Sequence, residues 1–231
     1  IGPTNQKYVN AEYENEVKNK FKAYVGLSNV SDYGYATNLK LCTSELVNYS
    51  NSECKDNNWM FYMATKIMID AGHGGTKDPG AVFEDRMEKD DTLRLALAVG
   101  RILEENGVNA VYTRTTDVYD TPYQKAEMGN EAEADYFVSL HRNAASEPGK
   151  GSGVMTLVYK TGRESEQLAD SIQRELARTG YVDLGVIERP DLIVLRKTQM
   201  PAVLVEVGFI DNPEDNKRFD AQFDEIAASF F

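Results

Sequence analysis

Long hydrophobic runs are missing from this sequence of 231 residues. No stretch approaches the roughly 20 consecutive apolar residues that a membrane-spanning helix needs, so we expect no membrane span. Residues 1–17 show no signal-peptide pattern either. A surplus of positive charge is also missing. The formal net charge is −12, which argues against nucleic acid as a partner because phosphate binding needs a basic face.

Cysteine and histidine are scarce. The two cysteines, Cys42 and Cys54, could form a disulfide in an oxidising setting, but two cysteines without a nearby histidine do not make a convincing metal site. The only two histidines are His73 and His141. In contrast, 42% of the residues are hydrophobic, which is enough for a core. The length fits one domain, or one domain with a small appendage.

Composition changes sharply early in the chain. Residues 1–62 contain ten Asn, six Lys and no Arg, whereas residues 63–231 contain six Asn, eight Lys and eleven Arg. The shift predicts a small N-terminal module at 1–62, either fused or partner-binding, ahead of a larger domain at 63–231. The alternative is a chance fluctuation, with Trp59, Phe61 and Tyr62 packing into the core of the larger domain. The composition of residues 1–62 identifies no ligand.

The larger domain alternates strand and helix signals. The expected strands lie at 66–70, 109–113, 135–140, 153–159, 192–195 and 202–207. The expected helices lie at 89–106, 122–134, 164–179 and from about Pro213 onward. Such alternation predicts an α/β fold with a single, mainly parallel, twisted sheet of about six strands and helices on both faces.

Three polar residues stand at the ends of expected strands. His73 follows the first strand through the turn Ala71–Gly72, His141 follows DYFVSL, and Glu206 ends an apolar run, PAVLVEVGFI. Ligands of open α/β sheets bind beyond the carboxyl ends of the strands, so these positions point to a site. A lone histidine at such a position is more simply a polar side chain that ends a strand. Two histidines at the same edge of the sheet favour a functional reading.

Glu88 offers a third ligand. On helical spacing it shares a stripe with Leu95, Val99 and Ile102, and an acid on a core-facing stripe must be paired or coordinated. The alternative is that the helix dipole alone favours an acid at this N-terminus. Two histidines and one glutamate, with a fourth position open, indicate a catalytic zinc site.

Four motifs resemble the zinc-dependent N-acetylmuramoyl-L-alanine amidases, the family of bacterial autolysins, sporulation amidases and phage endolysins. They occur in the family's order, and the resemblance runs from about Lys66 to the C-terminus. The motifs are DAGHGG (70–75), MEKDDTLRLA (87–96), SLHRNAA (139–145) and PAVLVEVGFIDNPED (201–215).

The resemblance implies that His73, Glu88 and His141 bind one Zn²⁺ per chain and that Glu206 is the catalytic glutamate. It implies peptidoglycan as substrate, with hydrolysis of the amide between N-acetylmuramic acid and the L-alanine of the stem peptide. The expected location is extracellular or at the cell wall, for a secreted protein or for a phage endolysin released from the cytoplasm. There are two alternatives. One is a non-catalytic wall-binding module of the same fold, and the other is a zinc hydrolase of another amide or peptide.

Two neighbours of His141 carry further expectations. Arg142 could engage a stem-peptide carboxylate bidentately, or it could turn to solvent or pair with a nearby acid. Asn143 could orient substrate, or it could only shape the turn.

Overall fold

The computed structural model describes residues 65–231. Their six-stranded sheet has the order β4-β1-β5-β8-β6-β7. Its strands are β1 (Lys66–Ala71), β4 (Asn109–Tyr112), β5 (Tyr136–Asn143), β6 (Val154–Val158), β7 (Asp183–Glu188) and β8 (Ala202–Phe209). Strands β4, β1, β5 and β8 are parallel, whereas β6 runs antiparallel to β8 and β7 runs parallel to β6. The predicted α/β class with a mainly parallel sheet is confirmed.

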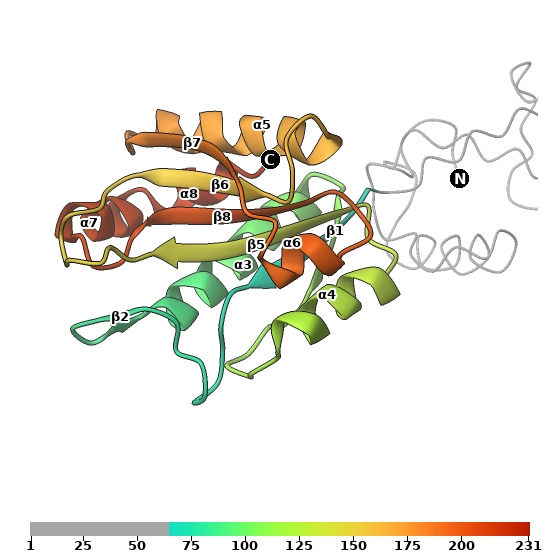
Figure 1. Ribbon diagram of the computed structural model, residues 1–231, viewed down its shortest axis with the longest axis horizontal. Helices are drawn as coiled ribbons and strands as arrows, with labels where there is room; N and C mark the ends of the chain where they lie inside the picture. The colour runs from blue at the N-terminus through green and yellow to red at the C-terminus, as the bar shows by residue number, and fades with distance from the viewer. Residues whose placement is uncertain (1–64) are drawn as a thin grey trace, which may run out of the picture. The chain divides into compact units, whose positions relative to one another are not determined.

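Helices cover both faces of this sheet. They are α3 (Glu88–Glu105), α4 (Pro122–Glu131), α5 (Glu164–Arg178), α6 (Ile193–Lys197), α7 (Pro213–Ala221) and α8 (Phe223–Ala228). In Figure 1, α4 and α6 lie in front of the sheet and α3 lies behind it. None of the described helices is long and apolar enough to span a membrane. The predicted module at 1–62, with its cysteines and aromatic residues, lies outside the described residues.

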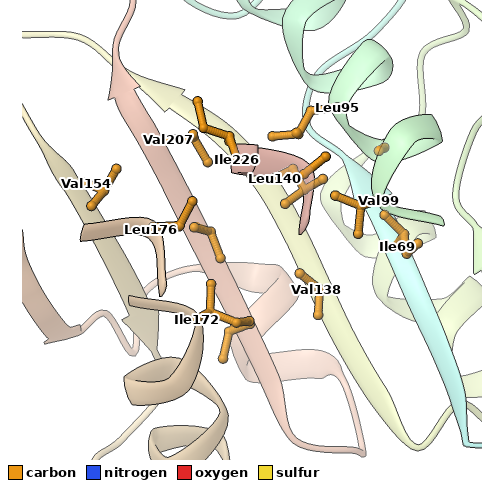
Figure 2. Packing of buried hydrophobic residues seen from close by; sticks show 14 of the residues in the cluster. Ile69, Leu95, Val99, Val138, Leu140, Val154, Ile172, Leu176, Val207 and Ile226 are labelled. Atoms are coloured by element: carbon orange, nitrogen blue, oxygen red, sulfur yellow. The ribbon is translucent and has the colours of Figure 1, made fainter. Parts of the chain in front are cut away.

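The two faces have separate apolar clusters because successive strand residues point to opposite sides. On β5, Val138 and Leu140 belong to the larger cluster, under α3, α5 and α8, whereas Phe137 belongs to the smaller one. Figure 2 shows the larger cluster, with Val99 of α3 near Ile69 of β1. Buried apolar side chains from sequence-distant strands and helices therefore hold the sheet rigidly in place.

The structure differs from the prediction at three places. The run 192–195 was predicted to be a strand, but Ile193–Lys197 forms helix α6, since a short apolar run cannot be told from a buried helix by periodicity. Strand β7 was missed because it is an edge strand that is mostly exposed. The short hairpin of β2 (Val82–Phe83) and β3 (Arg86–Met87) was also missed.

The sheet brings three strand ends together. Strand β5 pairs with β1 on one side and with β8 on the other, all parallel. Residues after Ala71 and Leu140, which are register partners, therefore emerge side by side. His141 and Glu206 are direct register partners on β5 and β8. This edge carries the candidate site.

Candidate metal centre

His73 lies in the loop after β1 in a constrained conformation. Its φ is 60°, in the left-handed region that residues other than glycine rarely adopt. Such strain persists where the surrounding structure enforces it, and it clusters at functional sites. Here Nδ1 lies 2.7 Å from Oδ1 of Asp78, which leaves Nε2 directed to Glu88 Oε2 at 3.1 Å.

Glu88 is the first residue of α3 and is 4% exposed. The Glu88 N–H donates to the Ala81 carbonyl at 2.9 Å, and the Ala81 N–H donates back to Oε2 at 2.8 Å. The Arg142 N–H donates to Oε1 at 3.0 Å. These bonds hold the carboxylate in one orientation at the start of the helix, between the loop and strand β5.

His141 completes the cluster from β5. Its Nδ1 lies 2.9 Å from Glu88 Oε1, and its ring meets that of His73 at 79° with centroids 4.8 Å apart. A Cβ at Gly72 would lie 2.5 Å from His141 Cε1, so only glycine leaves room for the ring there. The two imidazoles therefore flank one carboxylate.

The donor set fits zinc. One ligand atom from each of His73, Glu88 and His141 lies within 4.8 Å of the others. Two imidazole nitrogens with one carboxylate oxygen and an open position are a known catalytic zinc set, whose ligand atoms lie about 3.3 Å apart in tetrahedral geometry. His73 Nε2 lies 3.1 Å from Glu88 Oε2 and His141 Nδ1 lies 2.9 Å from Glu88 Oε1, so each nitrogen is near that spacing from one of the two carboxylate oxygens. The predicted ligands are thus brought together by the fold.

The charges of the cluster support one another. Burial acts to raise the pKa of Glu88, but the hydrogen bonds with His141 and His73 outweigh it and hold that pKa well below its usual range. Burial acts to lower the pKa of His73, but the hydrogen bonds with Glu88 and Asp78 outweigh it and raise that pKa. A metal ion requires the ionised glutamate but neutral imidazoles, so zinc would compete with the proton that the raised pKa of His73 favours.

Glu206 stands beside the cluster without belonging to it. Its side chain lies on the same face of the sheet as His141, because the two are register partners. Oε2 is buried and has no hydrogen-bond partner among the described residues. Burial raises the pKa of the Glu206 carboxyl, although His141 opposes this effect. A buried carboxylate oxygen without a partner is suited to exchange a proton with a bound molecule.

Arg142 does not reach the site, contrary to the expectation of a substrate contact. Its side chain is on the opposite face of β5 from His141, and the residue is 2% exposed. Nη1 donates to Asp91 Oδ2 at 2.5 Å and Nη2 donates to Asn216 Oδ1 at 2.7 Å. The guanidinium also lies 4.2 Å from the centroid of the Phe219 ring. The alternative of an ion pair with a nearby acid is the arrangement in the structure.

Asn143 lies at the end of β5, where the register with β8 shifts. Its Oδ1 accepts from the Ala144 N–H at 2.8 Å, so the side chain shapes the turn. Among the described residues, Nδ2 makes only a 3.7 Å contact, with the sulfur of Met155, a weak acceptor, which leaves the amide with donor capacity.

Three supporting residues were missed at the level of sequence. The sequence offered a signal for Asp78, because it is an acid five residues after His73 in the same loop. It offered no signal for Lys125 and Arg114. Both are buried cations from distant segments, and their side chains bond to the end of β1 and to the loop that carries His73. Burial of such groups cannot be read from local pattern.

Comparison with known proteins identifies the family. The pattern that describes N-acetylmuramoyl-L-alanine amidases matches residues 67–229, which is most of the chain. The chain belongs to the N-acetylmuramoyl-L-alanine amidase family. The resemblance seen in the four motifs is confirmed.

Two similar proteins of known name come from a phage and from a bacterium. The chain is 40% identical over 161 residues to the endolysin of Bacillus phage SPP1, covering 66% of this chain and 58% of that protein. It is 37% identical over 154 residues to the sporulation-specific N-acetylmuramoyl-L-alanine amidase of Bacillus subtilis (strain 168), covering 65% of this chain and 58% of that protein. The chain thus matches less than two thirds of the length of either relative.

Solved structures share the fold. The N-acetylmuramoyl-L-alanine amidase from Clostridium difficile 630 is similar with a TM-score of 0.68 at 30% identity, over 72% of this chain and 92% of that one. The catalytic domain of CwlV from Bacillus (Paenibacillus) polymyxa var. colistinus is similar with a TM-score of 0.67 at 32% identity, over 73% and 94%. Residues 65–231 therefore have the fold of an amidase catalytic domain.

Proposed function

We propose that the protein is a zinc-dependent hydrolase of peptidoglycan that cleaves the amide between N-acetylmuramic acid and L-alanine. The observation that carries this proposal is the cluster of His73, Glu88 and His141, beside which a carboxylate oxygen of Glu206 has no hydrogen-bond partner within residues 65–231. Membership of the amidase family and relatives named as amidases support the choice of substrate bond.

His73, Glu88 and His141 would hold one zinc ion per chain, His73 and His141 through the ring nitrogens that face Glu88. When bound, zinc supplies Lewis acidity, which polarises the scissile carbonyl and lowers the pKa of a water molecule toward about 7. Asp78 accepts from His73 Nδ1 and so keeps the proton on that nitrogen and Nε2 free as a ligand atom.

Glu206 is the general base and then the general acid. Its carboxylate takes a proton from the attacking water as the carbon–oxygen bond forms at the lactyl carbonyl. The same carboxyl then gives the proton to the alanine nitrogen as the carbon–nitrogen bond breaks. The raised pKa of Glu206 suits this exchange, since a more basic carboxylate accepts a proton more readily.

Asn143 is proposed to bind substrate through Nδ2, at the rim beside His141. The site of action is peptidoglycan of the cell wall, which fits an extracellular enzyme or an endolysin released from the cytoplasm. The relatives include both an endolysin and a sporulation amidase, so either setting is compatible with the fold.

Mass analysis of digested peptidoglycan tests the proposal. We expect free stem peptides that begin with L-alanine and glycan strands with intact lactyl groups. Glu206→Gln should bind zinc normally but hydrolyse at least about 10²-fold more slowly. Binding to cell walls without any release would instead indicate a wall-binding module, and cleavage only of small peptides would indicate a hydrolase of another amide.

Metal content tests the ligands. The purified chain should hold one zinc ion, and His141→Ala should lose it together with activity. Asn143→Ala is the matched control on the same strand, and it should retain zinc. A full equivalent of zinc and full activity in His141→Ala would refute the ligand assignment.

A further inference from the structure

Arg114, just beyond the end of β4, is a buried cation that the proposed reaction does not use. It is 3% exposed. Its guanidinium donates to the carbonyl oxygens of Ala71 (3.1 Å), Gly72 (2.9 Å), Lys89 (2.8 Å) and Thr116 (3.2 Å), and to Thr92 Oγ1 (3.2 Å). All five acceptors are neutral oxygens. No carboxylate among the described residues bonds to this guanidinium.

These acceptors flank two of the proposed zinc ligands. Gly72 directly precedes His73, and Lys89 directly follows Glu88. Nη2 of Arg114 bonds to both carbonyls, so a single nitrogen joins the loop after β1 to the first turn of α3. The two ligand segments come from different elements, and the spacing between their backbones decides where the two ligand atoms lie.

Thr92 reinforces the same junction. Its hydroxyl donates to the Gly72 carbonyl at 2.7 Å, one turn along α3 from Glu88. The Gly72 N–H in turn donates to the Leu140 carbonyl at 3.0 Å, and Leu140 precedes His141. Gly72 is thus bonded to the backbone beside the third ligand as well. The backbone neighbours of all three ligands are linked through this one glycine.

Stability alone is a weak reason for this arrangement. Burying a charged group that pairs with no carboxylate is costly, and apolar residues of similar volume often serve a core as well or better. A planar guanidinium has five donors in a fixed fork, so it can hold several carbonyls at set distances where an ammonium cannot. The geometry of the guanidinium therefore suits a residue that must fix the positions of several backbone carbonyl groups.

We propose that Arg114 and Thr92 are positioning residues that fix the spacing of the His73 and Glu88 backbones and thereby set the zinc affinity. This inference rests on the proposed zinc-dependent function. Arg114 and Thr92 act through the backbone, because neither side chain bonds to the side chain of a zinc ligand. Supporting groups of zinc ligands typically change metal affinity about 10- to 100-fold, and we expect the lower end here.

The test compares conservative variants at both positions. Thr92→Val removes the hydroxyl at nearly constant shape, whereas Thr92→Ser keeps it. Arg114→Lys keeps the charge but not the fork. Zinc affinity is measured on folded, metal-free protein by competition with a chromophoric chelator, and urea unfolding of the metal-free protein gives stability independently. We expect about tenfold weaker zinc binding for Thr92→Val and Arg114→Lys, and near-normal binding for Thr92→Ser.

Arg218→Lys is the matched control. Arg218 is a partly buried arginine away from the site, and its Nη1 donates to the Thr179 carbonyl at 3.3 Å. The substitution should change stability without changing zinc affinity. Wild-type affinity in Thr92→Val, which is the variant least able to disturb folding, would overturn the inference while leaving the proposed function intact. A wild-type chain that binds no zinc would overturn the proposed function itself.

Discussion

His73 and Asp78 are joined by a short hydrogen bond, with 2.7 Å between Nδ1 and Oδ1. An ionised carboxylate can only accept, so Nδ1 carries a proton toward Asp78, whereas Nε2 faces Glu88 and becomes a ligand atom when it carries no proton. The Gly80 N–H also reaches Asp78 Oδ1, at 3.3 Å, which anchors the carboxylate within the loop. The pair determines both the tautomer and the orientation of the ring.

Asp78→Ala should therefore weaken zinc binding by about 10- to 100-fold, because nothing else bonds to Nδ1 among the described residues. Asp78→Asn retains an acceptor and should show a smaller loss. Asp85→Asn, at an exposed acid of the neighbouring turn, is the control. Chelator competition measures all three, and equal affinity in Asp78→Ala and the wild type would mean that the ring is oriented by other contacts.

Asp70 and Lys125 form a buried ion pair below the site, with 2.8 Å between Nζ and Oδ1. Burial acts to raise the pKa of Asp70, but the Lys125 ammonium and the hydrogen bonds from Lys125 and Ser139 outweigh it and lower that pKa. The lowered pKa means that the pair adds stability above the unfolded-state pKa of about 3.9. That contribution is lost as the pH falls from there through the lower folded-state pKa.

Asp70→Asn should accordingly cost about 3–5 kcal/mol at neutral pH, because it leaves a buried ammonium uncompensated. Its free energy of unfolding should also fall less steeply than that of the wild type below about pH 4. The double variant Asp70→Asn/Lys125→Met should recover part of the neutral-pH loss. Urea titrations across the acid range measure these values, and parallel pH profiles for wild type and Asp70→Asn would contradict the assignment.

Arg142 should behave as a structural residue and not as a substrate contact. Arg142→Ala removes a buried ion pair with Asp91 and the contact with Phe219, so a loss of about 3 kcal/mol of stability is expected. The KM for peptidoglycan fragments should stay near the wild-type value at temperatures where the variant is folded. Unchanged stability with a several-fold higher KM would restore the substrate role. Arg94→Ala, at an exposed arginine, is the control.

A shortened chain beginning at Met63 should bind zinc and cleave peptidoglycan about as fast as the full chain. The reason is that residues 65–231 contain the whole described sheet, the three candidate zinc ligands and Glu206. The prediction follows from the composition change after residue 62 and treats residues 1–62 as a separate module. Thermal melting of both chains measures it, and a shortened chain that precipitates or melts far lower would mean that residues 1–62 complete the core.

Local pattern determined much of this protein. The strands around Ile69, Val138 and Val205 follow from short apolar runs, and the apolar stripe of α3 follows from a period of 3.6 residues. The same patterns place His73, His141 and Glu206 beyond or at strand ends and Glu88 on a buried stripe. In a parallel sheet these ends share one edge, so the cluster could be predicted without coordinates.

Tertiary structure alone decided what surrounds those residues. Strand β5 extends to Asn143, past the predicted end at Leu140, and the extra pleat sends Arg142 to the face opposite His141. Helix α6 was taken for a strand because an apolar run of four residues has no decisive period. The bonds of Arg114 and Lys125 to the end of β1 and the loop after it join segments more than forty residues apart. Such contacts depend on register and packing between elements, which a local sequence pattern does not contain.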